Sequence, residues 1–314
     1  MSSWADPFRE RLQLLTDLLP VVAREPRFAL KGGTAINLFE HDLPRLSVDV
    51  DLTWLPIGDF ADDRRAITAA LDALAQVLRA PPLRLHVAAS APAGAEGVTR
   101  LIASRPGARV QIETTPVMRG TVHPVRVMTV QPRVQAEFGF AQMQVLDFAD
   151  LYAGKLAATL SRQHPRDLFD VGLLLESGRL DAHLWRTFLV YLTASPKPAS
   201  ELLEPSEPRD LATAFRTQFE GMTAQPVTVD LLLQTRTQLL SRLPALLDEA
   251  ARAFLVSVER EAPDFTLIGL PQAANLPGVR RKLQNLAQRS AAKREADYRQ
   301  LAETLERIAV KGTP

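Results

Sequence analysis

The segment "FALKGGTAINLFEHDLPRLSVDVDLTW", residues 28 to 54, constrains the fold more than any other part of the chain. A short apolar run ends at two adjacent glycines, a stretch with helical spacing follows, and the last residues alternate between polar and apolar. This order predicts a strand, a tight turn, a helix with Thr34 as its N-cap, and a second strand. A mixed α/β unit is therefore expected in the N-terminal half.

The second predicted strand has two chemically different faces, because side chains alternate along a strand. One face is apolar and can pack against helices, whereas the other carries Arg45, Ser47, Asp49, Asp51 and Thr53. Two carboxylates about 7 Å apart at their Cα atoms suit Mg²⁺, which prefers oxygen ligands and also takes substrate phosphates. Each feature alone has a plainer interpretation, a tight turn or a solvated strand face. Together they favour a cation site, since two like charges on one face otherwise repel.

The glycine pair suits the binding of the phosphate groups that would share this cation. Because they lack Cβ atoms, Gly32 and Gly33 let backbone N–H groups approach phosphate oxygens, and the following helix N-terminus favours an anion. In "ARVQIETTPV", residues 108 to 117, Glu113 lies on the polar face of a further predicted strand. This residue is either a third metal ligand from a neighbouring strand or an ordinary surface glutamate.

Composition narrows the function classes. The 37 basic and 36 acidic side chains give a formal charge of +1, so any nucleic-acid affinity must come from a local patch. The absence of cysteine excludes disulfides, thiolate zinc sites and cysteine nucleophiles. No signal pattern or long apolar stretch is present, and a cytoplasmic protein without membrane association is expected.

The pattern along the chain changes near residue 147. Before it, helices are expected at 5–25 and 62–79, with strand candidates between residues 83 and 130; after it, nearly everything is helical. We therefore predict a first lobe at residues 1–145 and a helical lobe at 146–314. The Pro-rich stretch near 194–210 is predicted to be an exposed linker or long loop.

A second motif lies in the helical part. In "YAGKLAATLSRQHPRDLFDV", residues 152 to 171, Lys155 shares a helix face with apolar residues, and Pro165 starts another helix with Asp167 and Asp170 near its beginning. Lys155 either extends its ammonium to the edge of the core or meets triphosphate oxygens. A Lys155→Met variant is expected to keep its melting temperature. The two aspartates either compensate the helix dipole or act in catalysis.

These elements in order resemble the polymerase-beta-type nucleotidyltransferase fold, and more narrowly the AbiEii/AbiGii toxin branch that includes the mycobacterial MenT-type toxins. The resemblance covers about residues 28 to 175. It implies an α+β fold, with a mixed-sheet nucleotidyltransferase lobe and a largely α-helical C-terminal lobe. It also implies an NTP substrate, Mg²⁺ or Mn²⁺ as cofactor, and a cognate antitoxin encoded nearby. The implied residues are Asp49, Asp51, Lys155, Asp167 and Asp170 for catalysis; Asp49, Asp51 and Glu113 for metal; and Gly32, Gly33, Thr34, Ser47, Lys155 and Arg166 for the nucleotide.

The resemblance further implies a type IV toxin that blocks growth or phage propagation and transfers NMP to an acceptor, with a tRNA 3′ end or other RNA expected. Residues 280 to 299 contain seven basic residues on an apparent single helix, which is either an RNA contact or a solvated face. The alternatives are a nucleotidyltransferase that modifies a small molecule or protein, and an inactive nucleotide-binding module.

Overall fold

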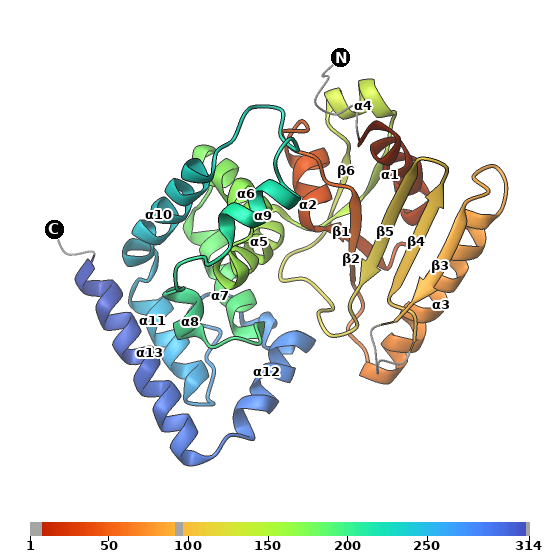
Figure 1. Cartoon of the computed structure of the whole chain (residues 1–314). Coiled ribbons are helices and arrows are strands. Elements are labelled where there is room, and N and C mark those ends of the chain that lie inside the picture. The colour runs from red at the N-terminus through yellow and green to blue at the C-terminus, as the bar shows by residue number, and fades with distance from the viewer. Residues whose placement is uncertain (1–7, 92–96, 312–314) are drawn as a thin grey trace. The chain divides into compact units, whose positions relative to one another are not determined.

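The computed structural model describes residues 8–91 and 97–311, which form two compact units (Figure 1). The first comprises Met1–Asp147 together with Gly221–Pro226, and the second comprises Phe148–Glu220 and Val227–Pro314. A mixed sheet with helices makes up the first unit and helices make up the second. The expected α+β class with a helical C-terminal part is confirmed.

The sheet of the first unit has seven strands in the order β3-β4-β5-β2-β1-β7-β6. Two of its neighbouring pairs are parallel, β2 with β5 and β1 with β7, and the others are antiparallel. Alternate residues of the central strands, such as Val50, Leu52 and Ile112, are fully buried. The strands are β1 Phe28–Lys31, β2 Asp49–Trp54, β3 His86–Ser90, β4 Arg100–Arg105, β5 Ala108–Thr114, β6 Arg126–Thr129 and β7 Gln142–Val145.

The helices of the first unit cover and connect this sheet. Helix α1 packs against β5 and β7, and α3 packs against β3 and β4. The chain between β1 and β2 forms α2 and then a π-helical turn, η2, whose apolar residues are buried. Their bounds are α1 Arg9–Val22, α2 Gly32–Ala35, η2 Ile36–Glu40, α3 Phe60–Arg79 and α4 Pro132–Phe138.

The second unit is a bundle centred on three consecutive helices. α5 packs on α6 and α7, α10 on α6, and α11 on α13. Its core contains large buried side chains, among them Tyr152, Trp185, Phe188 and Phe254. The helices are α5 Phe148–Arg162, α6 Pro165–Glu176, α7 Ala182–Ala194, α8 Ala199–Leu203, α9 Leu211–Gln218, α10 Val229–Leu246, α11 Glu249–Glu259, η3 Pro271–Asn275, α12 Pro277–Ala287 and α13 Ala291–Lys311. Within 8–91 and 97–311, no helix is both long and apolar enough to cross a membrane.

Several local predictions need correction. The first helix is shorter than the expected 5–25, whose residues 5–7 fall outside the described part of the chain. The strand with the two aspartates begins only at Asp49. The stretch 194–210 is not simply an exposed loop, because α8 forms inside it and buries Leu202 and Leu203. Two elements, α4 and β7, were not predicted, since both are short and lack strong periodicity.

Candidate active site

The glycine pair brings the backbone against the polar face of β2. Gly32 has φ +72°, and a Cβ atom there would lie 2.4 Å from Oδ2 of Asp51. A Cβ atom on Gly33 would lie 2.7 Å from a guanidinium nitrogen of Arg45 and 2.8 Å from Oγ of Ser47. Real Cβ contacts are not this short, so a side chain at either position would force its neighbours to shift, and the positive φ of Gly32 is a second reason for glycine at that position. The turn therefore lies against Asp51, a candidate metal ligand.

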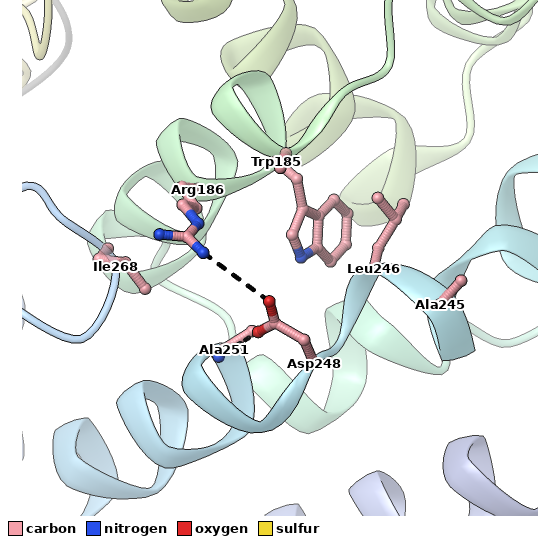
Figure 2. A pocket seen from close by; sticks show the side chains of 8 residues that line it. Trp185, Arg186, Ala245, Leu246, Asp248, Ala251 and Ile268 are labelled. Atoms are coloured by element: carbon pink, nitrogen blue, oxygen red, sulfur yellow. Dashed lines mark hydrogen bonds and ion pairs between the residues drawn. The ribbon is translucent and has the colours of Figure 1, made fainter.

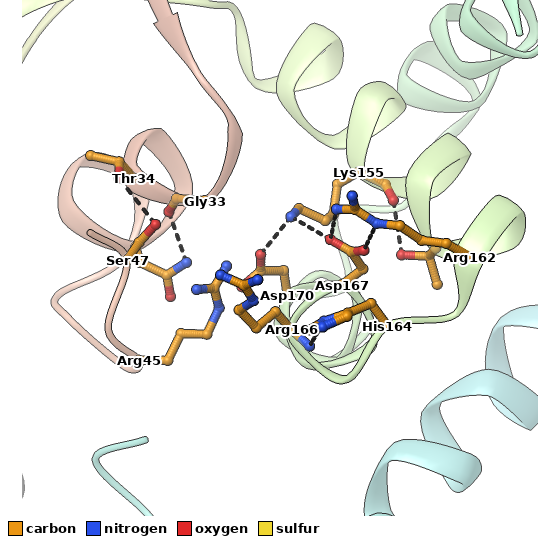
Figure 3. A network of polar contacts seen from close by, with 12 residues as sticks. Gly33, Thr34, Arg45, Ser47, Lys155, Arg162, His164, Arg166, Asp167 and Asp170 are labelled. Carbon is orange, nitrogen blue, oxygen red and sulfur yellow. Dashed lines mark hydrogen bonds and ion pairs between the residues drawn. The ribbon is translucent and has the colours of Figure 1, made fainter. Parts of the chain in front are cut away.

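Thr34 ties this turn to the strand instead of capping the helix. The helix begins at Gly32, so Lys31 holds the N-cap position, and no side chain caps it. The buried Thr34 hydroxyl donates to the carbonyl oxygen of Asp49 (2.6 Å) and lies 3.0 Å from Oγ of Ser47 (Figure 3). The predicted cap is therefore wrong, and the side chain fixes the start of β2.

The acidic residues form a row with basic neighbours. Strand register places Lys31 opposite Asp51, Asp51 beside Glu113, and Glu113 opposite Arg100, across β1, β2, β5 and β4. Directly paired residues project from the same face of a sheet. A guanidinium nitrogen of Arg100 lies 3.3 Å from Glu113. Asp49, Asp51 and Glu113 are all half-buried.

Lys31 was missed by sequence reasoning, although it directly precedes the glycine pair at the end of a strand. Its side chain is half-buried. Removal of water around the ammonium lowers the pKa of Lys31, and the charges of Asp51 and Glu113 partly oppose this shift. The signal that identifies it is the strand register, because only the register shows that Lys31 faces the carboxylates.

The donor set fits one divalent cation held by two carboxylates. Asp49 and Asp51 alternate on one strand face and remain partly accessible, and phosphate oxygens and water complete a typical Mg²⁺ shell. Among the residues described, no group of three or more histidine or acidic side chains is arranged to hold a metal ion. Glu113 is instead bonded to Gln111 (2.5 Å) and Arg100 (3.3 Å). The geometry therefore favours Asp49 and Asp51 over a three-carboxylate cage.

A second polar cluster lies in the helical unit, at the packing of α5 on α6 (Figure 3). The Lys155 ammonium is 2.9 Å from a carboxylate oxygen of Asp167 and 2.9 Å from one of Asp170. Lys155 is 8% exposed, Asp167 1% and Asp170 0%. The ammonium therefore lies inside the unit, where it compensates two buried carboxylates, and does not extend to the edge of the core.

Asp167 has a second basic partner in Arg162, whose side chain is largely exposed and bonds it through Nε at 2.6 Å. Burial opposes ionisation of Asp167, but the charges of Lys155 and Arg162 outweigh it and hold the pKa well below its usual range. Arg166, predicted to bind nucleotide, is half-exposed at the first turn of α6. Its backbone N–H donates to Nδ1 of His164 at 3.2 Å, so the imidazole is the N-cap of this helix.

The basic segment near the C-terminus is not one helix. Residues 280 to 299 span the end of α12 and the start of α13, with a break at residues 288–290. Lys282 is buried at 8% exposure, and Arg289 bonds Glu259 and Asp297. The Lys282 ammonium donates to the carbonyl oxygens of Ser195, Pro196 and Lys197. Part of the apparent basic patch therefore stabilises the fold.

A cavity of about 80 Å³ lies elsewhere in the helical unit, between α7, α10 and α11 (Figure 2). Asp248 caps α11 by accepting from the N–H of Ala251 (2.8 Å), and its carboxylate lies 3.8 Å from Arg186. Pockets for drug-sized ligands measure about 300–1,000 Å³. This cavity is too small for a nucleotide, so we do not assign it to the active site.

Paired carboxylates therefore lie beside a glycine turn, on the polar face of a mixed sheet. The family model described as "Nucleotidyl transferase AbiEii toxin, Type IV TA system" matches residues 13–307. Since the match spans nearly the whole chain, the protein belongs to the AbiEii family of nucleotidyltransferase toxins of type IV toxin–antitoxin systems. Membership implies an NTP substrate and an antitoxin partner.

The chain was also compared with curated proteins and with solved structures. A search of the curated proteins gives no match. Among solved structures, the chain is similar to MenT4, a nucleotidyltransferase toxin from Mycobacterium tuberculosis H37Rv, at 16% identity and a TM-score of 0.47. The alignment covers 99% of this chain and 95% of that one.

Proposed function

We propose that the protein transfers NMP from an NTP to an acceptor hydroxyl, with Mg²⁺, or Mn²⁺ in its place, held by Asp49 and Asp51. The observation that carries the proposal is the contact of Gly32 with Asp51, where a Cβ atom would approach Oδ2 to 2.4 Å. A phosphate chain over the glycine backbone then reaches the carboxylates without crossing a side chain. The metal ion, when bound, neutralises charge on the triphosphate oxygens.

The chain's own groups position the reactants. The hydroxyl of Thr34 donates to the carbonyl oxygen of Asp49, so this side chain orients the strand, whereas the Ser47 hydroxyl beside it can rotate to donate to a phosphate oxygen. The acceptor oxygen forms a bond to the α-phosphorus, the bond to pyrophosphate breaks, and a carboxylate takes the hydroxyl proton. Reactions of this type depend mainly on positioning and charge neutralisation.

In the helical unit, we assign Lys155, Asp167, Asp170 and Arg166 to the same reaction, as the resemblance implies. Their contacts and exposure support different roles for Lys155 and Arg166. Lys155 is engaged by two buried carboxylates, which supports a positioning role. Arg166 is half-exposed and has the bidentate geometry that phosphate favours, so it is the stronger candidate for a direct triphosphate contact.

For the acceptor we propose the 3′ end of an RNA, with tRNA as the first candidate and growth arrest or phage defence as the outcome. Arg280 and Arg281 on α12 are exposed, and the described contacts give neither a carboxylate partner. They supply local positive charge on a nearly neutral chain. A protein or small-molecule acceptor remains the alternative outcome of the test.

The test incubates the purified protein with cell extract and each of the four α-³²P-labelled NTPs, then separates RNA, protein and small molecules. We expect label on RNA and at least a ~100-fold loss of transfer in Asp51→Asn, because charge stabilisation of this kind is typically worth 10²–10³ in rate. Asp62→Asn, an exposed carboxylate paired with Arg65, is the matched control.

The outcomes separate the two parts of the proposal. Wild-type transfer by a folded Asp51→Asn protein would refute the carboxylate mechanism. Label on protein or small molecules, with none on RNA, would refute the RNA acceptor but leave the mechanism in place.

A further inference from the structure

A row of four charged residues crosses the sheet beside the candidate metal ligands. Register places Lys31, Asp51, Glu113 and Arg100 at consecutive paired positions on β1, β2, β5 and β4. The order of charges is basic, acidic, acidic, basic. The two inner carboxylates repel each other, and a cation on each side reduces that repulsion.

The two basic residues are not equivalent. Arg100 is paired in register with Glu113 and bonds its carboxylate at 3.3 Å. Lys31 is paired in register with Asp51, and the charges of Asp51 and Glu113 oppose the lowering of its pKa by burial. Lys31 is therefore the basic residue whose register position is directly opposite the candidate metal ligand Asp51.

The backbone holds Lys31 in this position. The preceding residues of β1, Phe28, Ala29 and Leu30, are at most 1% exposed and fix the strand in the core. The next residue, Gly32, has φ +72°, and a Cβ atom there would lie 2.4 Å from Oδ2 of Asp51. A lysine fixed between a core strand and this turn stays beside Asp51, unlike a lysine on a mobile surface loop.

We propose that Lys31 is a positioning residue that couples metal binding to nucleotide binding. In the metal-free protein its ammonium takes the place of a cation beside Asp51 and Glu113. A divalent ion must displace it, and the anionic triphosphate that arrives with the ion provides the displaced ammonium with new oxygen partners. This inference rests on the proposed function, because it takes Asp51 as a metal ligand.

The proposal makes two linked statements about affinity. Without nucleotide, Lys31 lowers the affinity for a divalent ion, because its positive charge competes for the same carboxylate. With metal present, Lys31 raises the affinity for the triphosphate, because its ammonium then contacts phosphate oxygens. A lysine that only stabilises the fold changes neither affinity in a folded protein.

The experiment uses the full chain as wild type, Lys31→Met, Lys31→Arg, Arg100→Met and Asp51→Asn. Mn²⁺ affinity is measured by electron paramagnetic resonance without nucleotide. Affinity for a fluorescent non-hydrolysable NTP analogue is measured at saturating Mn²⁺. Thermal melting identifies the folded variants, and Lys31→Gln replaces Lys31→Met if the latter does not fold.

We expect Lys31→Met to bind Mn²⁺ about tenfold more tightly and the analogue about tenfold more weakly, as a neighbouring unit charge implies. Lys31→Arg keeps the charge and is expected to match wild type. Arg100→Met removes the same charge farther from Asp51, so a smaller gain in Mn²⁺ affinity is expected.

Unchanged or weaker Mn²⁺ binding by folded Lys31→Met would overturn the inference, and so would tighter Mn²⁺ binding with unchanged analogue binding. Failure of the proposed function has a different signature. In that case Asp51→Asn binds Mn²⁺ as tightly as wild type, whatever Lys31 does.

Discussion

The structure changes what Lys155→Met is expected to do to stability. From the sequence, this variant keeps its melting temperature, because methionine preserves an apolar stem at a core edge. The structure instead places the ammonium at 8% exposure, 2.9 Å from Asp167 and 2.9 Å from Asp170. Methionine therefore removes the cation shared by two carboxylates that are almost fully buried.

The size of the effect follows from those contacts. Removal of one partner of a buried ion pair costs about 3–5 kcal/mol. Arg162 still bonds Asp167 after the substitution, but its side chain is 65% exposed and its charge is screened by water. We therefore expect a cost near the lower limit, about 3 kcal/mol, which for a domain of this size lowers the melting temperature by roughly 6–12 °C.

The assay is thermal and urea unfolding of wild type, Lys155→Met, and the double variant Lys155→Met/Asp170→Asn. The double variant removes one negative charge together with the positive one, so it is expected to recover most of the lost stability. Its toxicity is the informative measurement. A stable double variant that does not inhibit growth has lost chemistry and not folding.

The pH dependence provides a second check. The folded-state pKa of Asp167 lies below its unfolded value of about 3.9, so this group contributes stability above that pH that is lost as the pH falls through the folded pKa. Lys155→Met is expected to weaken this acid dependence. A melting temperature within 2 °C of wild type, with the same acid dependence, would refute the argument.

Two further predictions concern His164 and the basic residues of α12. Burial, together with the charge of Arg166, lowers the pKa of His164, so the imidazole that caps α6 contributes stability above pH ~6.5 that is lost as the pH falls. We expect the free energy of unfolding of wild type to fall by about 1 kcal/mol on acidification to pH 5. His164→Asn is expected to lose less, and urea unfolding measures both. A pH dependence that survives in His164→Asn would contradict this assignment. The double variant Arg280→Gln/Arg281→Gln, with the buried Lys282 retained, is expected to reduce the slope of log K for RNA binding against log salt concentration by about 1.4, the value for two single-strand phosphates. An unchanged slope in filter-binding titrations would exclude these two residues from the RNA interface.

The local part of the site could be predicted from the sequence because it is encoded within a few residues. Alternation along "SVDVDL" places Asp49 and Asp51 on one face whatever the rest of the chain does. The glycine pair likewise indicates a tight turn by itself, because glycine adopts a positive φ, such as that of Gly32, at little cost.

The charges around the two aspartates could not be predicted in the same way. Asp51 and Glu113 become neighbours only through the parallel pairing of β2 with β5, and Lys31 joins them through the antiparallel pairing with β1. A shift of one residue in either register would move the partner to the opposite face. Sequence periodicity fixes which residues share a strand face, but not which residues of another strand lie beside them.

The extent of the first unit could not be predicted from local sequence patterns either. Its residues 44–46 are held by a segment far along the chain: the N–H of Leu46 donates to the carbonyl of Met222 (2.8 Å), and the N–H of Ala224 donates to that of Pro44 (2.9 Å). Arg45, 2% exposed, lies within this paired segment beside Gly33. A lobe cut at residue 145 lacks these backbone partners, so the segment that carries Arg45 and Ser47 would lose its support. The residues that position the glycine turn therefore depend on a segment inside the part of the chain that was predicted to be helical. No pattern in that segment indicates that it pairs with residues 44–46.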